Sequence, residues 1–434
     1  MKTRIPYFLL LLPLFSLSQE NQHGDVYNYA RKIIDTLAAP GMHGRGYVSG
    51  GDSIAAKYIA ARFAEFGLKS FEKIDDKHPK GNYYQRFEMW VNTFPKTEIS
   101  INGKKLMPGK DFIIDPLSYS IKKNYKKVLY TGYPISKTVD SLGQDCKLGK
   151  TVIIMDSLPK RDWAFSFMNQ SDCPPFVFVT RSKLTWDVST YYSNEHMASA
   201  DILKSSLPGK INSIKINIES HVIGHKTQNL IAYLPGTQYP DSFIVFTAHY
   251  DHLGVMGHDE NGKEVYFPGA NDNASGCAML LNLAKYYSQH PQKYSIAFMA
   301  FAGEEAGLLG SKYYTEHPLF PLKQIKFLVN FDIMGTGDEG IKVVNATEFK
   351  TEFKTLQVLN AQNSYLKDVS PRGKTQNSDH YFFYANGVKC FFIYTLGGIK
   401  AYHDIYDRSE TLPLTKFEDV FKLMLDFTGW LQAN

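Results

Sequence analysis

The second half of the chain alternates between two hydrophobic patterns. From Asn229 onward, short apolar runs typical of strands buried on both faces are separated by segments whose apolar residues recur at helical spacing. The expected strands are 229–234, 243–248, 294–302, 327–331 and 390–395, and the expected helices are 275–287, 306–314, 353–359 and 417–431. This order predicts an α/β fold in which a central twisted mixed β-sheet is flanked by helices.

Two further helices are expected before this region. The first covers 26–37. The second begins with Asp52 or Ser53 as its N-cap and ends at Gly67, and it places Ala55, Ile59, Phe63 and Phe66 on one face. A strand with alternating burial is expected at 84–91.

The pattern changes between residues 93 and 221. Short β-like runs at 127–131, 151–155 and 176–180 lie between turns, and a helix is expected only in the stretch 184–203. We therefore expect a β-rich inserted domain at 93–221 within a discontinuous α/β domain made of 19–92 and 222–434.

The N-terminus has the features of a secretory signal peptide. Lys2 and Arg4 precede an apolar run over 7–17, and small residues follow at 16–18. The run is shorter than the roughly 20 apolar residues that span a bilayer, and Pro13 interrupts it. We expect residues 1–18 to be cleaved and the mature protein to be secreted or periplasmic, without a membrane span.

Composition and net charge indicate which classes of binding partner are not expected. The 434 residues are 44% hydrophobic and 21% charged, which is ordinary for a globular protein with two domains. The net charge of +5 contains no basic block, so nucleic acid and anionic membranes are not expected partners. The oligomeric state is not indicated.

The four cysteines match no zinc-binding or redox spacing. Export makes a disulfide between Cys146 and Cys173 chemically feasible, and free thiols at both positions are the alternative. Cys277 and Cys390 lie in apolar stretches and are expected to be buried as small hydrophobic residues.

Polar residues follow several of the expected strands. His249 and Asp251 follow the strand 243–248, Glu304 and Glu305 follow 294–302, Asp332 follows 327–331, and His403 follows 390–395. Ligands of open α/β sheets bind beyond the carboxyl ends of the strands, so these side chains are expected to converge at one edge.

Such a cluster of carboxylates requires cations. Close like charges disfavour ionisation unless a positive charge intervenes. Histidine and carboxylate ligands without thiolates suit zinc best, and manganese and cobalt are the alternatives. Asp272, in the loop 269–276, can bridge two ions about 3.5–4 Å apart. Each residue alone is a weak signal, and spacing leaves open which of Glu304 and Glu305 binds metal.

At these residues the chain resembles the zinc-dependent exopeptidase family of bacterial leucyl aminopeptidases and plasma glutamate carboxypeptidase, with the glutaminyl cyclases as a divergent branch. The matching segments are 44–46, 227–236, 248–254, 269–276, 301–311, 330–335, 378–380 and 402–403. The insertion, around 149–154, is similar to a protease-associated domain.

The resemblance implies a centre of two zinc ions. It places His249 and Asp332 on one ion and Glu305 and His403 on the other, with Asp272 bridging them. It makes Glu304 the general base. It also makes Asp251 the acceptor of a hydrogen bond from His249, since metal-bound imidazoles usually need such a partner.

The resemblance implies an aminopeptidase that acts on peptides. Three alternatives remain: a glutaminyl-peptide cyclase, a carboxypeptidase on the same fold, and a non-catalytic binding module. Arg372 and Arg408 are the arginines near the motifs that could read a substrate carboxylate. Residues 378–380 either belong to the site or serve loop structure and helix capping.

Overall fold

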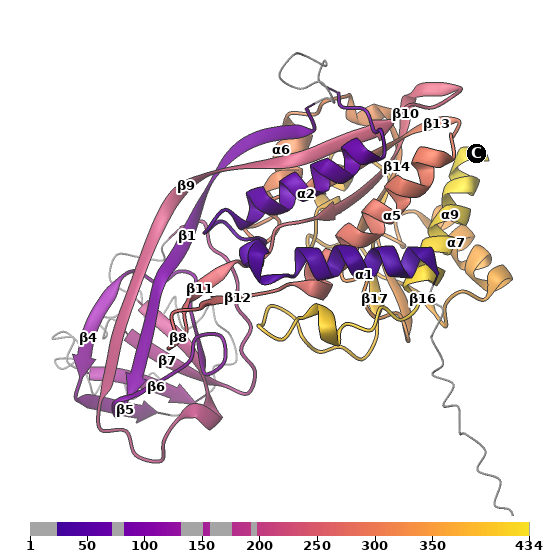
Figure 1. Cartoon of the computed structure of the whole chain (residues 1–434). Helices are drawn as coiled ribbons and strands as arrows, with labels where there is room; N and C mark the ends of the chain where they lie inside the picture. Colours follow the sequence, from indigo (N-terminus) through magenta and orange to yellow (C-terminus); the bar gives the residue numbers. More distant parts are fainter. Residues whose placement is uncertain (1–23, 72–81, 132–150, 157–175, 192–197, 434) are drawn as a thin grey trace, which may run out of the picture.

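The structure is a computed structural model that describes residues 24–71, 82–131, 151–156, 176–191 and 198–433. It has a body in which helices cover a sheet and a β-rich lobe beside it (Figure 1). We use "lobe" for the described residues within 93–221. The predicted signal peptide and Cys146 and Cys173 lie outside the described residues.

The central sheet is mixed and twelve-stranded. Its main path runs in the order β12-β11-β1-β9-β13-β10-β14-β17-β15-β16. Four neighbouring strands of this path are parallel, in the order β13-β10-β14-β17. The strands are β1 (Tyr84–Ile101), β9 (Ile214–Leu234), β10 (Tyr239–His249), β11 (Val255–His258), β12 (Glu264–Tyr266), β13 (Tyr294–Phe301), β14 (Ile325–Phe331), β15 (Gly340–Val344), β16 (Val369–Pro371) and β17 (Cys390–Leu396). The carboxyl ends of the four parallel strands therefore meet at one edge.

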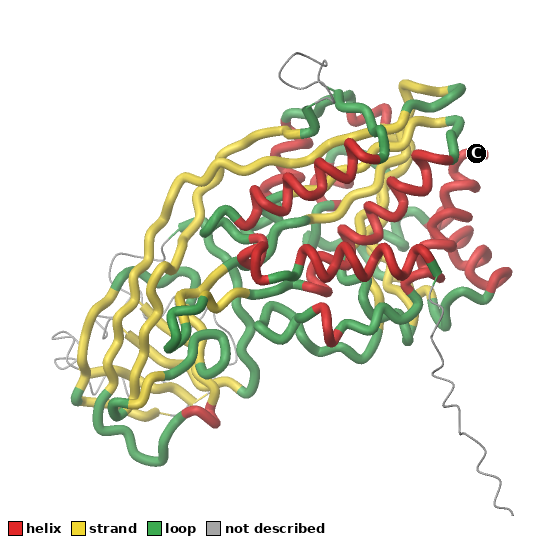
Figure 2. The backbone as a smooth tube through the Cα atoms, in the orientation of Figure 1, coloured by secondary structure: helices red, strands yellow, loops and turns green. Residues whose placement is uncertain are grey.

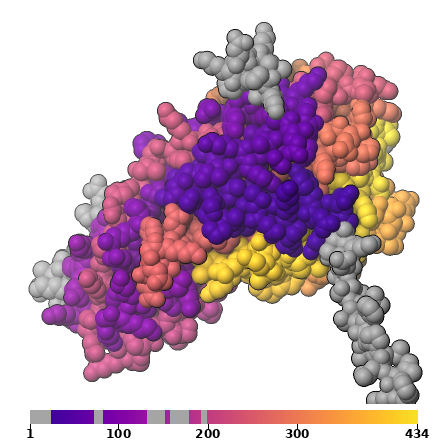
Figure 3. All heavy atoms as spheres, viewed as in Figure 1, coloured from indigo at the N-terminus to yellow at the C-terminus, as the bar shows by residue number. Residues whose placement is uncertain are grey.

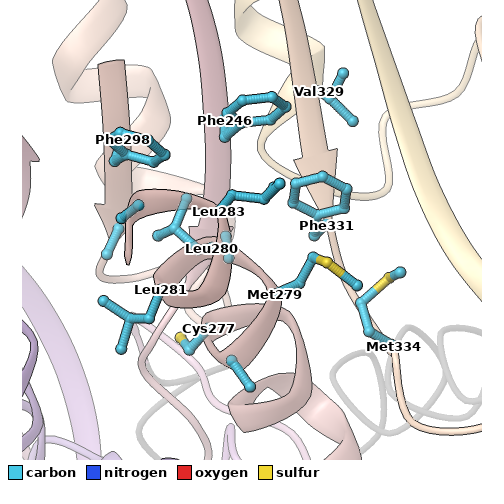
Figure 4. Close-up of a cluster of buried hydrophobic side chains, with 14 of the residues drawn as sticks. Phe246, Cys277, Met279, Leu280, Leu281, Leu283, Phe298, Val329, Phe331 and Met334 are labelled. Carbon is cyan, nitrogen blue, oxygen red and sulfur yellow. The ribbon is translucent and has the colours of Figure 1, made fainter. Parts of the chain in front are cut away.

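Helices cover both faces of this sheet. On one face lie α1 (Asp25–Leu37), α2 (Gly51–Glu65), α5 (Gly276–Gln289), α7 (Lys350–Asn363) and α9 (Phe417–Ala433). On the other lie α6 (Leu309–Glu316) and α8 (His380–Ala385). Successive strand residues alternate between the faces, so Phe246 packs with the first group and Val245 with the second. Figure 4 shows Phe246, Phe298 and Phe331 from the strands around Leu280 and Leu283 of α5.

The lobe is built on extensions of two strands of the body. β1 and β9 run side by side from the body into the lobe (Figures 1 and 2). There β2 (Lys104–Lys105) and β4 (Ile121–Tyr125) pair with them. A second sheet has the order β3-β8-β7-β6-β5 and consists of β3 (Phe112–Ile114), β5 (Lys127–Thr131), β6 (Thr151–Asp156), β7 (Phe176–Arg181) and β8 (Ala198–Leu203).

The predicted limits of the insertion fall inside these long strands. Asn92 pairs with Val222, and Thr93 pairs with His221. The ladder is irregular between Thr93 and Lys96. A division into separate domains at 93–221 remains our proposal.

The α/β fold with a helix-flanked mixed sheet is confirmed, but two local predictions were wrong. The expected helix at 184–203 is absent from its described parts, which are irregular at 184–191 and form β8 at the end. Asp52 does not cap α2, whose N-cap is Gly50 without a side-chain bond. Its carboxylate instead accepts hydrogen bonds from His225 and Thr227, both at 2.8 Å, because the first turn of α2 is buried against β9.

Two other predictions concern burial. Cys277 and Cys390 are free and fully buried, as expected. Within the described part of the chain, no helix is both long and apolar enough to cross a bilayer.

Candidate metal centre

The predicted site residues gather at the carboxyl edge of the parallel strands. His249 is the last residue of β10, and Asp332 directly follows β14. Glu304 and Glu305 lie in the turn after β13. Asp272 lies in the tight turn before α5, and His403 lies in the irregular loop after β17 with a positive φ of 51°.

The five predicted ligands converge in two groups that share one carboxylate. His249 Nε2 lies 3.3 Å from Asp272 Oδ1 and 3.5 Å from Asp332 Oδ1. His403 Nε2 lies 3.1 Å from Asp272 Oδ2 and 3.1 Å from Glu305 Oε2. Each imidazole thus directs Nε2 to the cluster, and the two oxygens of Asp272 face different imidazoles.

Glu304 joins the first group. One carboxylate oxygen of Glu304 and the ligand atoms of His249 and Asp332 lie within 4.8 Å of one another, so the three side chains could bind a single ion. The second group that satisfies this distance is His249, Asp272 and Glu305.

The electrostatics of the cluster call for positive charge. Burial and neighbouring carboxylates raise the pKa of Glu304 and Asp332, whereas the charges of His403 and His252 outweigh burial and lower the pKa of Glu305 to about 2. Burial alone would lower the pKa of His249 and His403, but the surrounding carboxylates raise both above the usual range. Among the described residues, no lysine or arginine forms an ion pair with these carboxylates.

These residues fit divalent metal. Asp332 Oδ1 is buried without a hydrogen-bond partner, and it points to the same group as His249 Nε2. A nitrogen and oxygen donor set without sulfur is what zinc accepts in catalytic sites. Two divalent cations would supply the positive charge that this cluster of carboxylates needs.

Asp251 contacts residues of both groups. Its carboxylate is fully buried and accepts hydrogen bonds from the Tyr47 hydroxyl at 2.5 Å and from the backbone N–H groups of Glu304 and Glu305 at 3.3 and 3.2 Å. His249 Nδ1 lies 3.7 Å from this carboxylate and 3.3 Å from the Asp251 backbone oxygen. The Asp251 carboxylate therefore holds the glutamate turn. The hydrogen bond from His249 to this carboxylate, which the resemblance implied, stays a prediction, because His249 Nδ1 lies closer to the backbone oxygen than to the carboxylate.

Several residues at the site were missed by sequence reasoning. His252 Nδ1 lies 2.7 Å from Glu305 Oε1, and Asp407 accepts hydrogen bonds from the backbone N–H groups of Asn271 and Asp272 at 2.8 and 2.9 Å. His252 lies within the motif 248–254, so its position was a usable signal. Asp407 gave no such signal, because its partners are 135 and 136 residues away.

The lobe also contacts the cluster. His403 Nδ1 lies 2.9 Å from the backbone oxygen of Trp186 and 3.0 Å from Asp187 Oδ1. The backbone N–H of Trp186 donates in return to the His403 oxygen at 2.8 Å. No sequence pattern linked 184–191 to the site.

Residues 378–380 lie beside the cluster. The Ser378 hydroxyl accepts a hydrogen bond from Asn330 at 2.9 Å and lies 3.4 Å from Asp332 Oδ2. Asp379 is the N-cap of α8 without a side-chain cap bond, and burial together with nearby carboxylates raises its pKa to about 7. Of the two alternatives, proximity to the site holds, and capping by the Asp379 side chain does not.

Residues 229–428 match the model of peptidase family M28. This match confirms the family resemblance indicated by the motifs, and it covers the strands and loops that carry all seven predicted site residues. It begins within β9, so the lobe lies outside it.

Relatives of known annotation are similar over shorter stretches. A probable zinc metalloprotease of Pyrenophora teres f. teres is 36% identical over 118 residues, which are 26% of this chain and 23% of that protein. The aminopeptidase YwaD of Bacillus subtilis is 29% identical over 182 residues, which are 41% of this chain and 36% of that protein. The chain thus spans only about a quarter of the length of the zinc metalloproteases that it matches.

Solved structures share the whole fold. A zinc aminopeptidase from Bacillus subtilis superimposes with a TM-score of 0.70 at 18% identity and covers 92% of this chain and 94% of its own. An aminopeptidase from Aneurinibacillus sp. strain AM-1 gives a TM-score of 0.61 at 20% identity, with 92% of each chain covered. At this identity the likeness establishes the architecture.

Proposed function

We propose that this chain is an exported, zinc-dependent metallopeptidase that removes N-terminal residues from peptides. The observation that carries the proposal is the shared carboxylate: Asp272 presents one oxygen to His249 and the other to His403. Such an arrangement suits a pair of divalent ions rather than one. The M28 match and the relatives named aminopeptidase support the reaction class.

The proposed ligands divide as the sequence resemblance implied. His249 and Asp332 would hold one ion, Glu305 and His403 the other, and Asp272 would touch both. The distances between these groups support this division. When bound, two zinc ions lower the pKa of a water molecule and polarise the scissile carbonyl.

Glu304 is the proposed general base. Its side chain lies in the group with His249 and Asp332, and its backbone N–H is fixed by Asp251. It would accept the proton of the attacking water as the carbon–oxygen bond forms. It would then deliver that proton to the departing amine as the carbon–nitrogen bond breaks.

Glu304→Gln tests this role. The variant should keep the zinc content of the wild type and lose about 10²–10⁴-fold in kcat, because the amide cannot accept the proton. Glu260→Gln is a matched control, since Glu260 is exposed at the turn between β11 and β12. A kcat near that of the wild type for Glu304→Gln would remove Glu304 from the mechanism.

A panel of aminoacyl-p-nitroanilides tests the reaction class. Hydrolysis should disappear with a chelator and return when zinc is added back. A peptide with N-terminal glutamine distinguishes the cyclase alternative. Mass spectrometry would show the loss of ammonia if the glutamine cyclises and the loss of a whole residue if it is removed. A protein that binds zinc and converts neither substrate would favour the binding-module alternative.

The carboxypeptidase alternative has less support from the geometry. The Arg372 guanidinium donates to the Tyr394 hydroxyl at 3.0 Å, and Arg408 Nε donates to the Ile405 backbone oxygen at 2.9 Å. Neither acceptor is a predicted site residue, so these contacts place no arginine on the metal centre. Release of C-terminal residues from a peptide blocked at its N-terminus would overturn the aminopeptidase assignment.

A further inference from the structure

We propose that Asp187 of the lobe is a positioning residue for His403, so that the lobe forms part of the metal centre. This inference rests on the proposed function, because it assumes that His403 binds metal. It goes beyond that function by assigning the inserted lobe a direct part in holding one ion.

His403 needs support from outside its own segment. It lies seven residues beyond the end of β17, in a loop without regular structure, and its backbone is left-handed. A histidine in such a conformation is held by its surroundings rather than by local backbone preference. Neither a strand nor a helix directs this imidazole toward Asp272 and Glu305.

The lobe supplies that support through one short segment. The backbone oxygen of Trp186 and the carboxylate of Asp187 both lie within hydrogen-bond distance of His403 Nδ1, at 2.9 and 3.0 Å. The backbone N–H of Trp186 also donates to the backbone oxygen of His403, so both the side chain and the backbone of His403 are bound to Trp186. Donation from Nδ1–H fixes the tautomer in which Nε2 keeps its lone pair for metal.

The segment is itself anchored in the lobe. Trp186 is buried, and its indole N–H donates to the Ile114 backbone oxygen of the lobe at 2.9 Å. Its ring also lies 4.7 Å from that of Phe267 in the body. Ile405, two residues after His403, packs into the same hydrophobic cluster. The position of His403 is thus tied to the packing of the lobe.

A second contact docks the lobe without touching the imidazole. Lys183 Nζ donates to the Lys400 backbone oxygen at 2.6 Å and lies 3.3 Å from Asp404 Oδ2. In Figure 3 the yellow C-terminal segment runs along the lower edge of the body beside the lobe. Lys183 therefore offers a matched control, because its replacement removes one exposed contact between the lobe and this loop and leaves the acceptors of His403 intact.

The two acceptors differ in how replaceable they are. The Trp186 oxygen belongs to the backbone and remains in any side-chain variant. The side chain of Asp187 is 45% exposed, so solvent screens part of its charge. Loss of Asp187 should therefore weaken the hold on one ion without abolishing it.

The experiment compares zinc retention and kinetics in the full chain for wild type, Asp187→Ala, Asp187→Asn and Lys183→Met. A chromogenic chelator reports the release of each ion. We expect Asp187→Ala to lower the affinity for one of the two zinc ions about 10-fold, which is the lower end of the range for residues that hydrogen-bond a metal ligand. Its kcat should fall at added-zinc concentrations that saturate the wild type, with KM little changed.

The other two variants separate positioning from docking. Asp187→Asn keeps an acceptor oxygen and should restore most of the zinc retention, and Lys183→Met should match the wild type. Equal zinc release from wild type and Asp187→Ala would overturn the inference. So would equal losses in Asp187→Ala and Lys183→Met, or Asp187→Asn no better than Asp187→Ala. A wild-type protein that binds no zinc would overturn the proposed function as well.

Discussion

The two imidazoles of the site perform the same proposed task with opposite kinds of support. His249 ends a buried central strand, and its Nδ1 faces the backbone oxygen and carboxylate of Asp251, two residues away in sequence. His403 lies in a loop, and its Nδ1 faces the backbone oxygen of Trp186 and the carboxylate of Asp187, which are 217 and 216 residues away. One half of the site is held locally and the other by a distant insertion.

The environments of the two carboxylates differ in the same sense. Asp251 is fully buried and makes hydrogen bonds with Tyr47 and two backbone N–H groups. Asp187 is half exposed. The His249 half therefore depends on the stability of the body, whereas the His403 half depends on how the lobe packs against the loop. Mutations in the His249 half should therefore mainly lower the stability of the protein, whereas mutations in the His403 half should mainly weaken the binding of one ion.

The largest expected effect is on the His249 half, at Arg45. This guanidinium is fully buried and donates to five backbone oxygens on three segments of the chain, those of Leu37, of Tyr250, and of Pro268, Gly269 and Asp272 in one loop. Arg45→Met leaves these oxygens without their donor and removes a positive charge that interacts with Asp272 and Asp251. We expect a loss of about 3–5 kcal/mol in the free energy of unfolding, measured by chemical denaturation.

Arg62→Met is the control for this prediction. Arg62 lies on α2 and forms a surface ion pair with Glu65 at 2.8 Å, so its loss should cost less than about 1 kcal/mol. A similarly small cost for Arg45→Met would show that the loops around His249 are held together by other contacts, and the contrast between the halves would weaken.

A buried histidine without a carboxylate partner among the described residues shows by contrast what such partners contribute. His380 packs 5.2 Å from the ring of Phe392, and burial lowers its pKa to about 4. As the pH falls below the unfolded pKa of about 6.5, the unfolded chain binds a proton before the folded chain does. Stability from this group is therefore present above pH 6.5 and is lost by about 1.4 kcal/mol per pH unit down to pH 4, about 3 kcal/mol in total.

His380→Leu should remove this slope. Unfolding free energies of chelator-treated wild type and variant, measured from pH 7 to pH 4, should differ progressively as the pH falls. Parallel curves would contradict the effect of burial on His380. They would also question the contrast with His249 and His403, whose carboxylate neighbours raise the pKa of each imidazole.

Sequence reasoning succeeded for the half of the site that is local. Strands such as 243–248 carry a strong apolar signal, and His249, Asp332 and the Glu304–Glu305 pair follow directly from where these strands end. It failed at 184–191, which has no periodicity and whose role depends on a contact with His403 across more than 200 residues. Long-range hydrogen bonds to a backbone oxygen leave no pattern in a single sequence.

The smallest expected effect is at Tyr47, the hydroxyl partner of Asp251. Tyr47→Phe keeps the ring, including its edge contact with His225 at 5.5 Å, and removes one hydrogen bond to a buried carboxylate. The two backbone N–H bonds to Asp251 remain, so we expect a loss of about 1.5 kcal/mol in unfolding free energy. The exposed Tyr239 serves as the control, since Tyr239→Phe should change stability by less than about 0.5 kcal/mol.

If the two halves differ as argued, Tyr47→Phe lowers the free energy of unfolding and leaves the release rates of both zinc ions nearly unchanged. Asp187→Ala should instead speed the release of one zinc ion and leave the free energy of unfolding nearly unchanged. Faster zinc release in Tyr47→Phe than in Asp187→Ala would reverse the assignment, because the metal centre would then depend more on the buried partner than on the lobe.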